Sequence, residues 1–298
     1  MSATAGSALV DALAADVDRL CGAEPEVRAD LPDSVHSMRV ATRRLRSVLK
    51  SYRRVLRRKP IGEITDELRW LAGLLGVARD AEVRAERFVT LLGDTGAPFD
   101  ERTVPLGEKS APRGDFGTRL VADERRLYVG AHRAVVDAFD SRRYRMLTDR
   151  LHALVTDAPL RGTQADNPAD QVFAEVLRHD FRDLRRLVRT EPGLTGAERI
   201  EHLHDIRKAA KRLRYSSEAA ADVLGDPAVE LGKRAKRLQG VLGDHRDAVE
   251  SLQTLRTHAA HAAESGYQRL CDAEEAAAAK ALEQYPEATE FLRHRPLS

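Results

Sequence analysis

Apolar side chains recur through residues 35–56 at the spacing of an α-helix. They stand three or four residues apart, a pattern that places them on one helix face: Val35, Met38, Thr42, Leu45, Leu49, Tyr52 and Leu56. The same pattern moved forward by one residue contains only basic side chains: His36, Arg39, Arg43, Arg46, Lys50, Arg53 and Arg57. Because one residue corresponds to about 100° of helix rotation, the sequence predicts a buried face flanked by a stripe of positive charge.

This pattern returns in the second half of the chain. Residues 203–214 read LHDIRKAAKRLR, against VHSMRVATRRLR at 35–46, a separation of 168. A second block, LAGLLGVARDAEV at 71–83, recurs as LQGVLGDHRDAVE from 238, a separation of 167. Two blocks in the same order at nearly one separation indicate an internal duplication. We predict a first helical repeat over 1–156, a linker over 157–168 and a second helical repeat over 169–298.

Helical periodicity dominates both halves, and no segment shows the alternation of a strand. The predicted helices cover 7–20, 34–58, 61–76, 79–92, 119–138 and 141–156, then 169–190, 196–223, 227–242, 245–264, 266–284 and 287–294. Residues 93–117 are predicted to form a loop. Only 5% of the residues are aromatic, so the core must consist of Leu, Val and Ala, which suits all-α bundles of the four-helix kind.

Charge is segregated along the chain. The net charge of +2 is small, yet no acidic residue occurs from Ser34 to Gly62. From His36 to Arg57 a helix would extend about 31 Å, with a basic group about every 5 Å. Of the 49 basic residues 41 are Arg, whose donors fit phosphate oxygens. An Arg-rich genome would explain Arg in place of Lys, but it would not explain the stripe, which predicts binding of a long, regularly charged anion.

Other classes of protein are disfavoured. Two distant cysteines, Cys21 and Cys271, form no disulfide framework and fit a reducing, cytoplasmic location. No apolar run approaches the length of a membrane span, so no membrane association is expected. No metal-ligand motif, phosphate loop or nucleophile motif stands out. We therefore expect no cofactor, no metal and no catalytic residue.

The block H-x-x-R-x-x-x-[RK]-R-x-R occurs twice, each time followed by L-x-G-x-L-G-x-x-R-D. These blocks resemble the CHAD family, the conserved histidine α-helical domain. The resemblance covers nearly the whole chain, so that 1–298 is expected to be a single CHAD domain. It implies two tandem antiparallel four-helix bundles, related by a pseudo-two-fold axis, whose basic helices line a shared groove. It also implies binding of inorganic polyphosphate and association with polyphosphate granules.

The resemblance assigns polyphosphate-binding candidates position by position. They are His36, Arg39, Arg43, Arg44, Arg46 and Lys50 in the first copy, and His204, Arg207, Lys208, Lys211, Arg212 and Arg214 in the second. Arg53 continues the first stripe, and Arg69 and Lys236 are a corresponding pair near the second block. The second stripe continues through Glu218 and Ala221 and is therefore shorter. Arg44 and Arg212 point about 130° away from the stripe and could face the other bundle.

Several residues have two interpretations. His36 and His204 could contact phosphate or simply pack between helices. Asp80 and Asp247 are expected to cap a helix or orient an arginine, in preference to metal or acid–base chemistry. A third basic stripe either extends the groove or forms a solvated face: Arg178, Arg182, Arg185 and Arg189.

The favoured function is non-catalytic binding of polyphosphate. One alternative is nucleic-acid binding through the same stripe, as a weaker partner, although few aromatic residues are available for base stacking. A metal-dependent phosphoanhydride hydrolase is a further alternative. It would need a carboxylate cluster. Some CHAD chains also carry a CYTH triphosphatase domain, but this sequence has no ExExK-like carboxylate array.

Overall fold

The computed structural model describes residues 3–96, 99, 115–258, 263 and 266–296. Within these ranges the chain is helical apart from turns and two isolated bridges, so the predicted all-α class is confirmed. The elements are α1 (Ala5–Gly22), α2 (Glu24–Arg28), α3 (Ser34–Ser51), α4 (Arg58–Thr95), α5 (Phe116–Phe139), α6 (Arg142–Thr156), α7 (Gly162–Ala165), α8 (Ala169–Thr190), η2 (Glu191–Gly193), α9 (Gly196–Ala219), α10 (Ala221–Leu224), α11 (Asp226–Thr257), α12 (Tyr267–Glu283), α13 (Tyr285–Thr289) and η4 (Glu290–Arg293).

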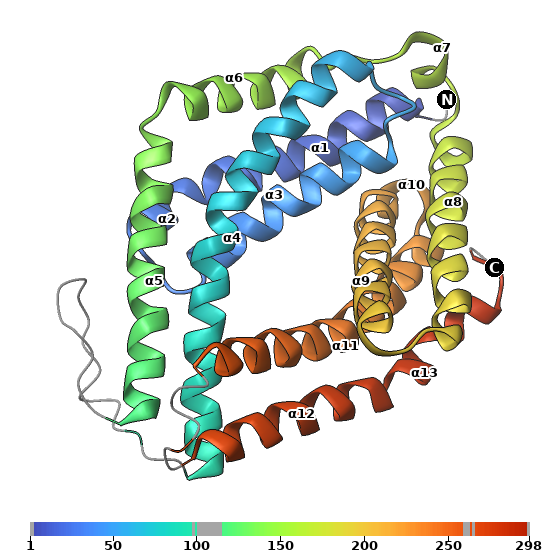
Figure 1. Ribbon diagram of the computed structural model, residues 1–298. Helices are drawn as coiled ribbons and strands as arrows, with labels where there is room; N and C mark the ends of the chain where they lie inside the picture. The colour runs from blue at the N-terminus through green and yellow to red at the C-terminus, as the bar shows by residue number, and fades with distance from the viewer. Residues whose placement is uncertain (1–2, 97–98, 100–114, 259–262, 264–265, 297–298) are drawn as a thin grey trace.

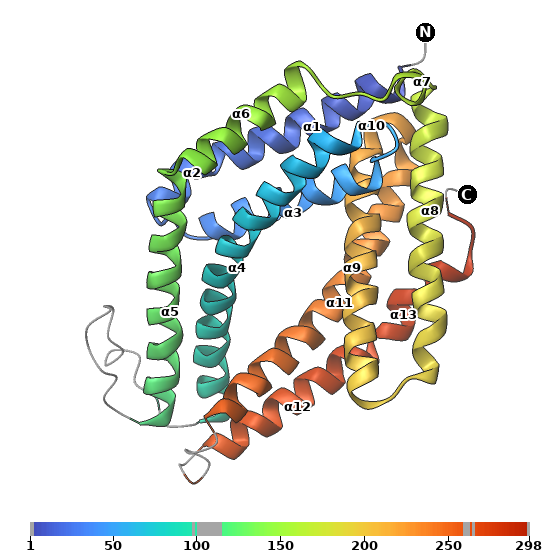
Figure 2. The same ribbon diagram turned by 45° about the horizontal axis from the view of Figure 1, so that its top comes forward.

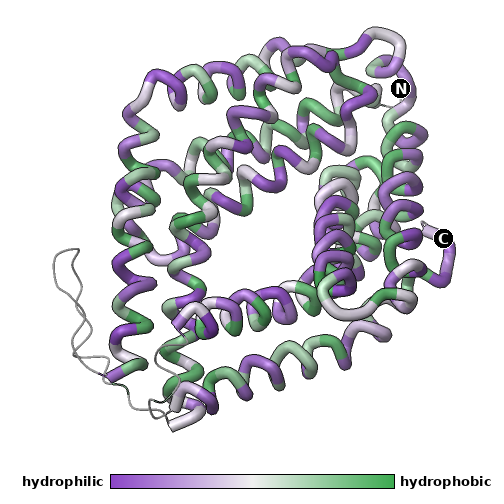
Figure 3. Tube along the Cα trace, viewed as in Figure 1, coloured by the Kyte–Doolittle hydropathy of each residue, from purple (hydrophilic) through white to green (hydrophobic). Residues whose placement is uncertain are grey.

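The helices are arranged as a four-sided frame (Figures 1 and 2). On one side α4 runs beside α5, and on the next α11 runs beside α12. The third side contains α8 and α9, and α1, α3 and α6 close the frame. Hydrophilic and hydrophobic residues alternate in bands along the helices (Figure 3), as expected for helices with one buried face.

The first basic helix is shorter than predicted. Instead of running to residue 58, α3 ends at Ser51, and the prediction is wrong for 52–57. The backbone beyond Tyr52 is bonded to the segment between the repeats: Arg161 N donates to Val55 O at 2.8 Å, and Arg57 N donates to Pro159 O at 2.8 Å. These tertiary bonds replace helical ones, so Arg53 and Arg57 extend from a turn.

Two predicted helix breaks do not occur. The helices predicted over 61–76 and 79–92 form one helix, α4, and those over 227–242 and 245–264 merge into α11, which ends at Thr257. Asp80 and Asp247 therefore lie inside helices, and the predicted capping role is wrong. Residues 259–262 and 264, and most of the predicted loop 93–117, lie outside the described residues. The helix predicted over 196–223 ends earlier, as α9 at Ala219.

A single large core runs through both halves. It includes Leu9, Leu45 and Leu68 of the first repeat together with Leu213 and Leu238 of the second. Tyr52 is fully buried in it and donates its hydroxyl to Ser216 O of α9 at 3.0 Å. The buried residues thus do not separate into one core per repeat, and the prediction of two four-helix bundles is not confirmed.

A smaller core joins the far ends of α4 and α5 to those of α11 and α12. It contains Phe88, Phe116, Leu255 and Leu270 among its buried residues. One residue before Phe88, Arg87 on α4 donates two hydrogen bonds to Glu274 on α12, from Nε to Oε1 at 2.6 Å and from Nη2 to Oε2. Glu274 is fully buried. This ion pair connects the two repeats far from the large core.

We expect Glu274→Ala to lower the free energy of unfolding by about 3 kcal/mol, because it leaves Arg87 partly buried without its carboxylate. Chemical denaturation measures the effect. Glu275→Ala is a matched control, since Glu275 forms an exposed pair with Arg256 at 2.9 Å and should contribute less than about 1 kcal/mol. Equal losses for the two variants would contradict a stabilising role for the buried pair.

Candidate anion-binding groove

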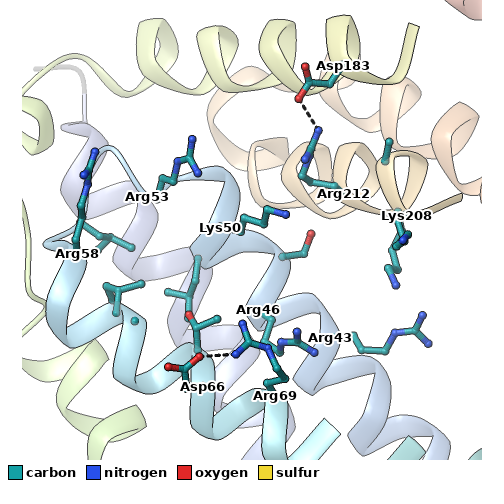
Figure 4. A pocket seen from close by; sticks show the side chains of 18 of the residues that line it. Arg43, Arg46, Lys50, Arg53, Arg58, Asp66, Arg69, Asp183, Lys208 and Arg212 are labelled. Atoms are coloured by element: carbon teal, nitrogen blue, oxygen red, sulfur yellow. Dashed lines mark hydrogen bonds and ion pairs between the residues drawn. The ribbon is translucent and has the colours of Figure 1, made fainter. Parts of the chain in front are cut away.

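A groove of about 1030 Å³ lies where α3 and α4 approach α8 and α9. Three aspartates line it, against eleven basic residues: Arg43, Arg46, Lys50, Arg53, Arg57, Arg58, Arg69, Arg186, Lys208, Lys211 and Arg212. Full ionisation would leave an excess of eight positive charges. In Figure 4 the labelled cations of α3 and α4 lie across the groove from Lys208 and Arg212 of α9. The two basic stripes, far apart in the sequence, therefore border the same space.

The packing of the two apolar helix faces explains this convergence. Each face is called a seam below. On α3 the seam residues Met38, Leu45 and Leu49 are fully buried, and on α9 the corresponding seam buries Ile206 and Leu213. Each basic stripe lies about 100° from its seam, at the edge of the buried face. When two such helices pack together, the edges meet, and the charged stripes have to share one boundary of the contact.

The most crowded charges are Arg43 and Lys211, which occupy corresponding positions of the two copies. Burial, then Arg39, lowers the pKa of Arg43 to about 10. Burial, then Arg43 and Arg207, lowers the pKa of Lys211 to about 7. Both shifts oppose the charged form because the site is short of solvent and rich in like charge. A bound anion would offset the repulsion between these like charges.

The two signature blocks of each copy pack against one another. Arg39 donates from Nη1 to Asp80 Oδ1 at 2.7 Å. In the other copy Arg207 lies against Gly243, where an added Cβ would stand 3.4 Å from its guanidinium. Burial raises the pKa of Asp247, while Arg207 opposes that shift. Asp80 thus orients an arginine, one of the two structural roles predicted, and glycine leaves room for the guanidinium.

Neither histidine lines the groove. Burial, then Arg79, lowers the pKa of His36, and burial, then Lys208 and Arg246, lowers the pKa of His204. Both shifts favour the neutral imidazole. A phosphate close to either would raise its pKa, and their role as phosphate contacts stays a prediction.

Eight of the fifteen predicted binding residues line the groove: Arg43, Arg46, Lys50, Arg53, Arg69, Lys208, Lys211 and Arg212. The other seven do not, and their roles stay predictions: His36, Arg39, Arg44, His204, Arg207, Arg214 and Lys236. The third basic stripe of α8 does not contribute to the lining, whereas the adjacent Arg186 does. No periodic signal singled out Arg186. The acid-free run that contains Arg57 and Arg58 could have identified both.

The groove cations differ in how far the protein neutralises them. Arg212 pairs with Asp180 at 3.0 Å and Asp183 at 2.8 Å, and Arg69 pairs with Asp66 at 2.5 Å. By contrast, in the described part of the chain Arg46 and Lys50 have no carboxylate partner, and Arg46 Nε is buried without a hydrogen bond. A buried donor without a partner is costly, so an external anion would be stabilising at this position.

Within the described residues, no three His, Cys, Asp or Glu side chains gather into a group that could hold a metal ion. Among the described helices, none is long and apolar enough to cross a membrane.

Lys211 should react with an amine-directed reagent at far lower pH than an ordinary lysine, because only the neutral amine is nucleophilic. Competitive labelling followed by mass spectrometry across the titration should give a midpoint near pH 7, with labelling increasing as pH rises. Arg43→Gln should shift that midpoint upward by removing the like charge that lowers the pKa of Lys211 most. Lys233, exposed and bonded to Glu230 at 2.7 Å, is the control. Identical midpoints for Lys211 and Lys233 would rule out the crowding described above.

The family model of the CHAD domain matches residues 11–256. Two uncharacterized proteins from strains of Mycobacterium tuberculosis, MT2285 and Rv2226, are each 36% identical over 241 residues, which is 80% of this chain and 43% of theirs. This chain therefore spans less than half of their length.

Two solved structures share the fold. PptA from Streptomyces chartreusis has a TM-score of 0.72 at 18% identity, covering 96% of this chain and 99% of that one. The CHAD domain from the plant Ricinus communis has a TM-score of 0.68 at 23% identity, covering 99% and 94%. Together with the family match over most of its length, these similarities establish that the chain belongs to the CHAD domain family.

Proposed function

We propose that this protein binds inorganic polyphosphate, without catalysis, in the groove between α3 and α9. The observation that carries the proposal is the convergence of both repeated basic helices on one groove, with eleven basic and three acidic side chains. Polyphosphate is a chain of closely spaced anionic groups, and its regular charge matches a row of cations repeated once per helical turn. Binding releases the counterions of both surfaces, which supplies a large part of the affinity, as in nucleic-acid complexes.

The shape of the groove favours an extended ligand over a compact one. The groove-lining part of the first stripe on α3, from Arg43 to Lys50, measures about 10 Å, and Arg53, Arg57 and Arg58 continue it along the following turn. Its cations are spread along this path and do not converge on one point. A nucleotide triphosphate would occupy only a fraction of them.

The lining also favours polyphosphate over nucleic acid. No Phe, Tyr or Trp is among the described residues that line the groove. Proteins that hold single strands without sequence preference usually stack bases on such side chains. The phosphates of a nucleic acid could still contact the same cations, so we propose nucleic acid as a weaker, competing ligand.

Membership of the CHAD family supports three wider elements of the proposal. We propose that the two repeats are related by a pseudo-two-fold axis through the crossing of α3 and α9. We further propose a cytoplasmic location and association with polyphosphate granules, for which the groove would serve as the attachment site.

Binding isotherms with polyphosphates of graded length, with ATP and a DNA oligomer as controls, test the proposal. If six to eight phosphates are contacted, log K should fall against log[salt] with a slope of roughly −4 to −7. Long chains should bind far more tightly than triphosphate, and they should displace DNA at lower phosphate concentration than the reverse. Tighter binding of DNA, or phosphate release on adding Mg²⁺ or Mn²⁺, would favour one of the two rival functions.

Replacing Arg46 and Lys50 together with Ala should weaken polyphosphate binding by about 1.5–3 kcal/mol for each charged hydrogen bond to phosphate that the variant removes. Stability should change little, since Ala favours the helix and the seam of α3 is untouched. The paired variant Lys233→Ala with Arg237→Ala is the control. It removes the same charge from exposed pairs on α11, with Glu230 at 2.7 Å and Glu287 at 2.8 Å. An equal loss in the control would mean that the ligand senses bulk charge and that the groove is not the site.

A further inference from the structure

The duplication provides a second hollow that is the counterpart of the groove. It measures about 400 Å³ and is lined by residues of α1, α2, α3 and α9. Its residues on α3 and α9 stand 168 positions from groove residues: Arg44 corresponds to Arg212, Arg214 to Arg46, Ala41 to Ala209 and Glu218 to Lys50. The internal repeat therefore places residues equivalent to those of the groove around a second hollow.

The two hollows differ most at one pair of positions. Where the groove has Lys50, the second hollow has Glu218, whose carboxylate accepts hydrogen bonds from both Arg44 and Arg214, the latter from Nε at 2.8 Å. Arg44 also donates from Nε to the fully buried Asp16 at 2.6 Å. In the second hollow three arginines face two glutamates, an excess of one charge against eight in the groove.

We propose that Glu218 determines where the polyphosphate lies, closing the second hollow to anions so that each chain binds on one side of the α3–α9 crossing only. This inference rests on the proposed function of the groove. An anion that entered the second hollow would have to break the ion pairs of Arg44 and Arg214 while lying against a carboxylate. If Glu218 moved aside, the partly buried guanidinium groups of Arg44 and Arg214 would each lose one carboxylate partner.

The position of Glu218 also explains how the repeats can be similar and yet work differently. Arg43 and Lys211 are each other's counterparts in the repeat, so the repeat alone would place both in each hollow. Only the groove includes them in its lining. The proposed anion path therefore starts at the crossing, runs along the first copy past Lys50 and Arg53, and does not enter the second hollow. Glu218 thus restricts the proposed path to the groove side of the crossing.

Glu218→Lys, which restores the residue of the first copy, tests the inference. Isothermal titration with a short polyphosphate should give one ligand per protein for the unaltered chain and two for the variant. With long chains the salt slope should steepen by about 0.7–0.9 for each additional phosphate contacted. Glu230→Lys, on the exposed start of α11, makes the same charge change away from both hollows and should keep one ligand and an unchanged slope.

Glu218→Gln serves if the lysine variant does not fold, because Arg44 keeps Asp16 as its partner. It should steepen the salt slope less than the lysine variant. One ligand per protein and an unchanged slope in folded Glu218 variants would overturn the inference, while the groove would stand. No binding by the unaltered chain would instead overturn the proposed function, and this inference with it.

Discussion

The contact between α3 and α9 forces like charges together, and the features of the groove follow from it. Each helix has its basic stripe at the edge of its buried seam, so packing the seams brings Arg43 and Lys211 into one poorly solvated region. The core that spans both repeats holds them there, with Tyr52 bonded across to Ser216. The energy of apolar burial thus maintains a charge arrangement that is unfavourable by itself and that a bound polyanion would relieve.

The carboxylates decide which of the cations remain available. Arg39 is paired with Asp80, Arg44 with Asp16 and Arg212 with Asp180, all of them away from the middle of the first stripe. Arg46 and Lys50 have no such partner within the described ranges. The observed distribution gives the groove an excess of eight positive charges and its counterpart an excess of one.

The sequence predicts what depends on local periodicity. The all-α class, the two basic helices and five groove residues follow from three- and four-residue spacing and from the repeat, because a basic stripe beside a buried apolar face must lie at the edge of that face. The resemblance to the family, and not the spacing, assigned Arg69, Lys208 and Arg212. The end of α3 at Ser51 depends on bonds from Val55 and Arg57 to residues a hundred positions away, which no local pattern encodes. The predicted helices 227–242 and 245–264 left a break at 243–244, whereas Gly243 accommodates Arg207 inside one continuous helix. Arg186 joins the groove only because α8 packs on α9.

The most direct test of this account is a crystal structure of the protein with a bound polyphosphate. The account predicts a continuous row of phosphates along the groove, with oxygens within hydrogen-bond distance of Arg46, Lys50 and Lys211, and no phosphate beside Glu218. A chain bound along the outer face of α8, on Arg178, Arg182 and Arg189, with the groove empty, would contradict it.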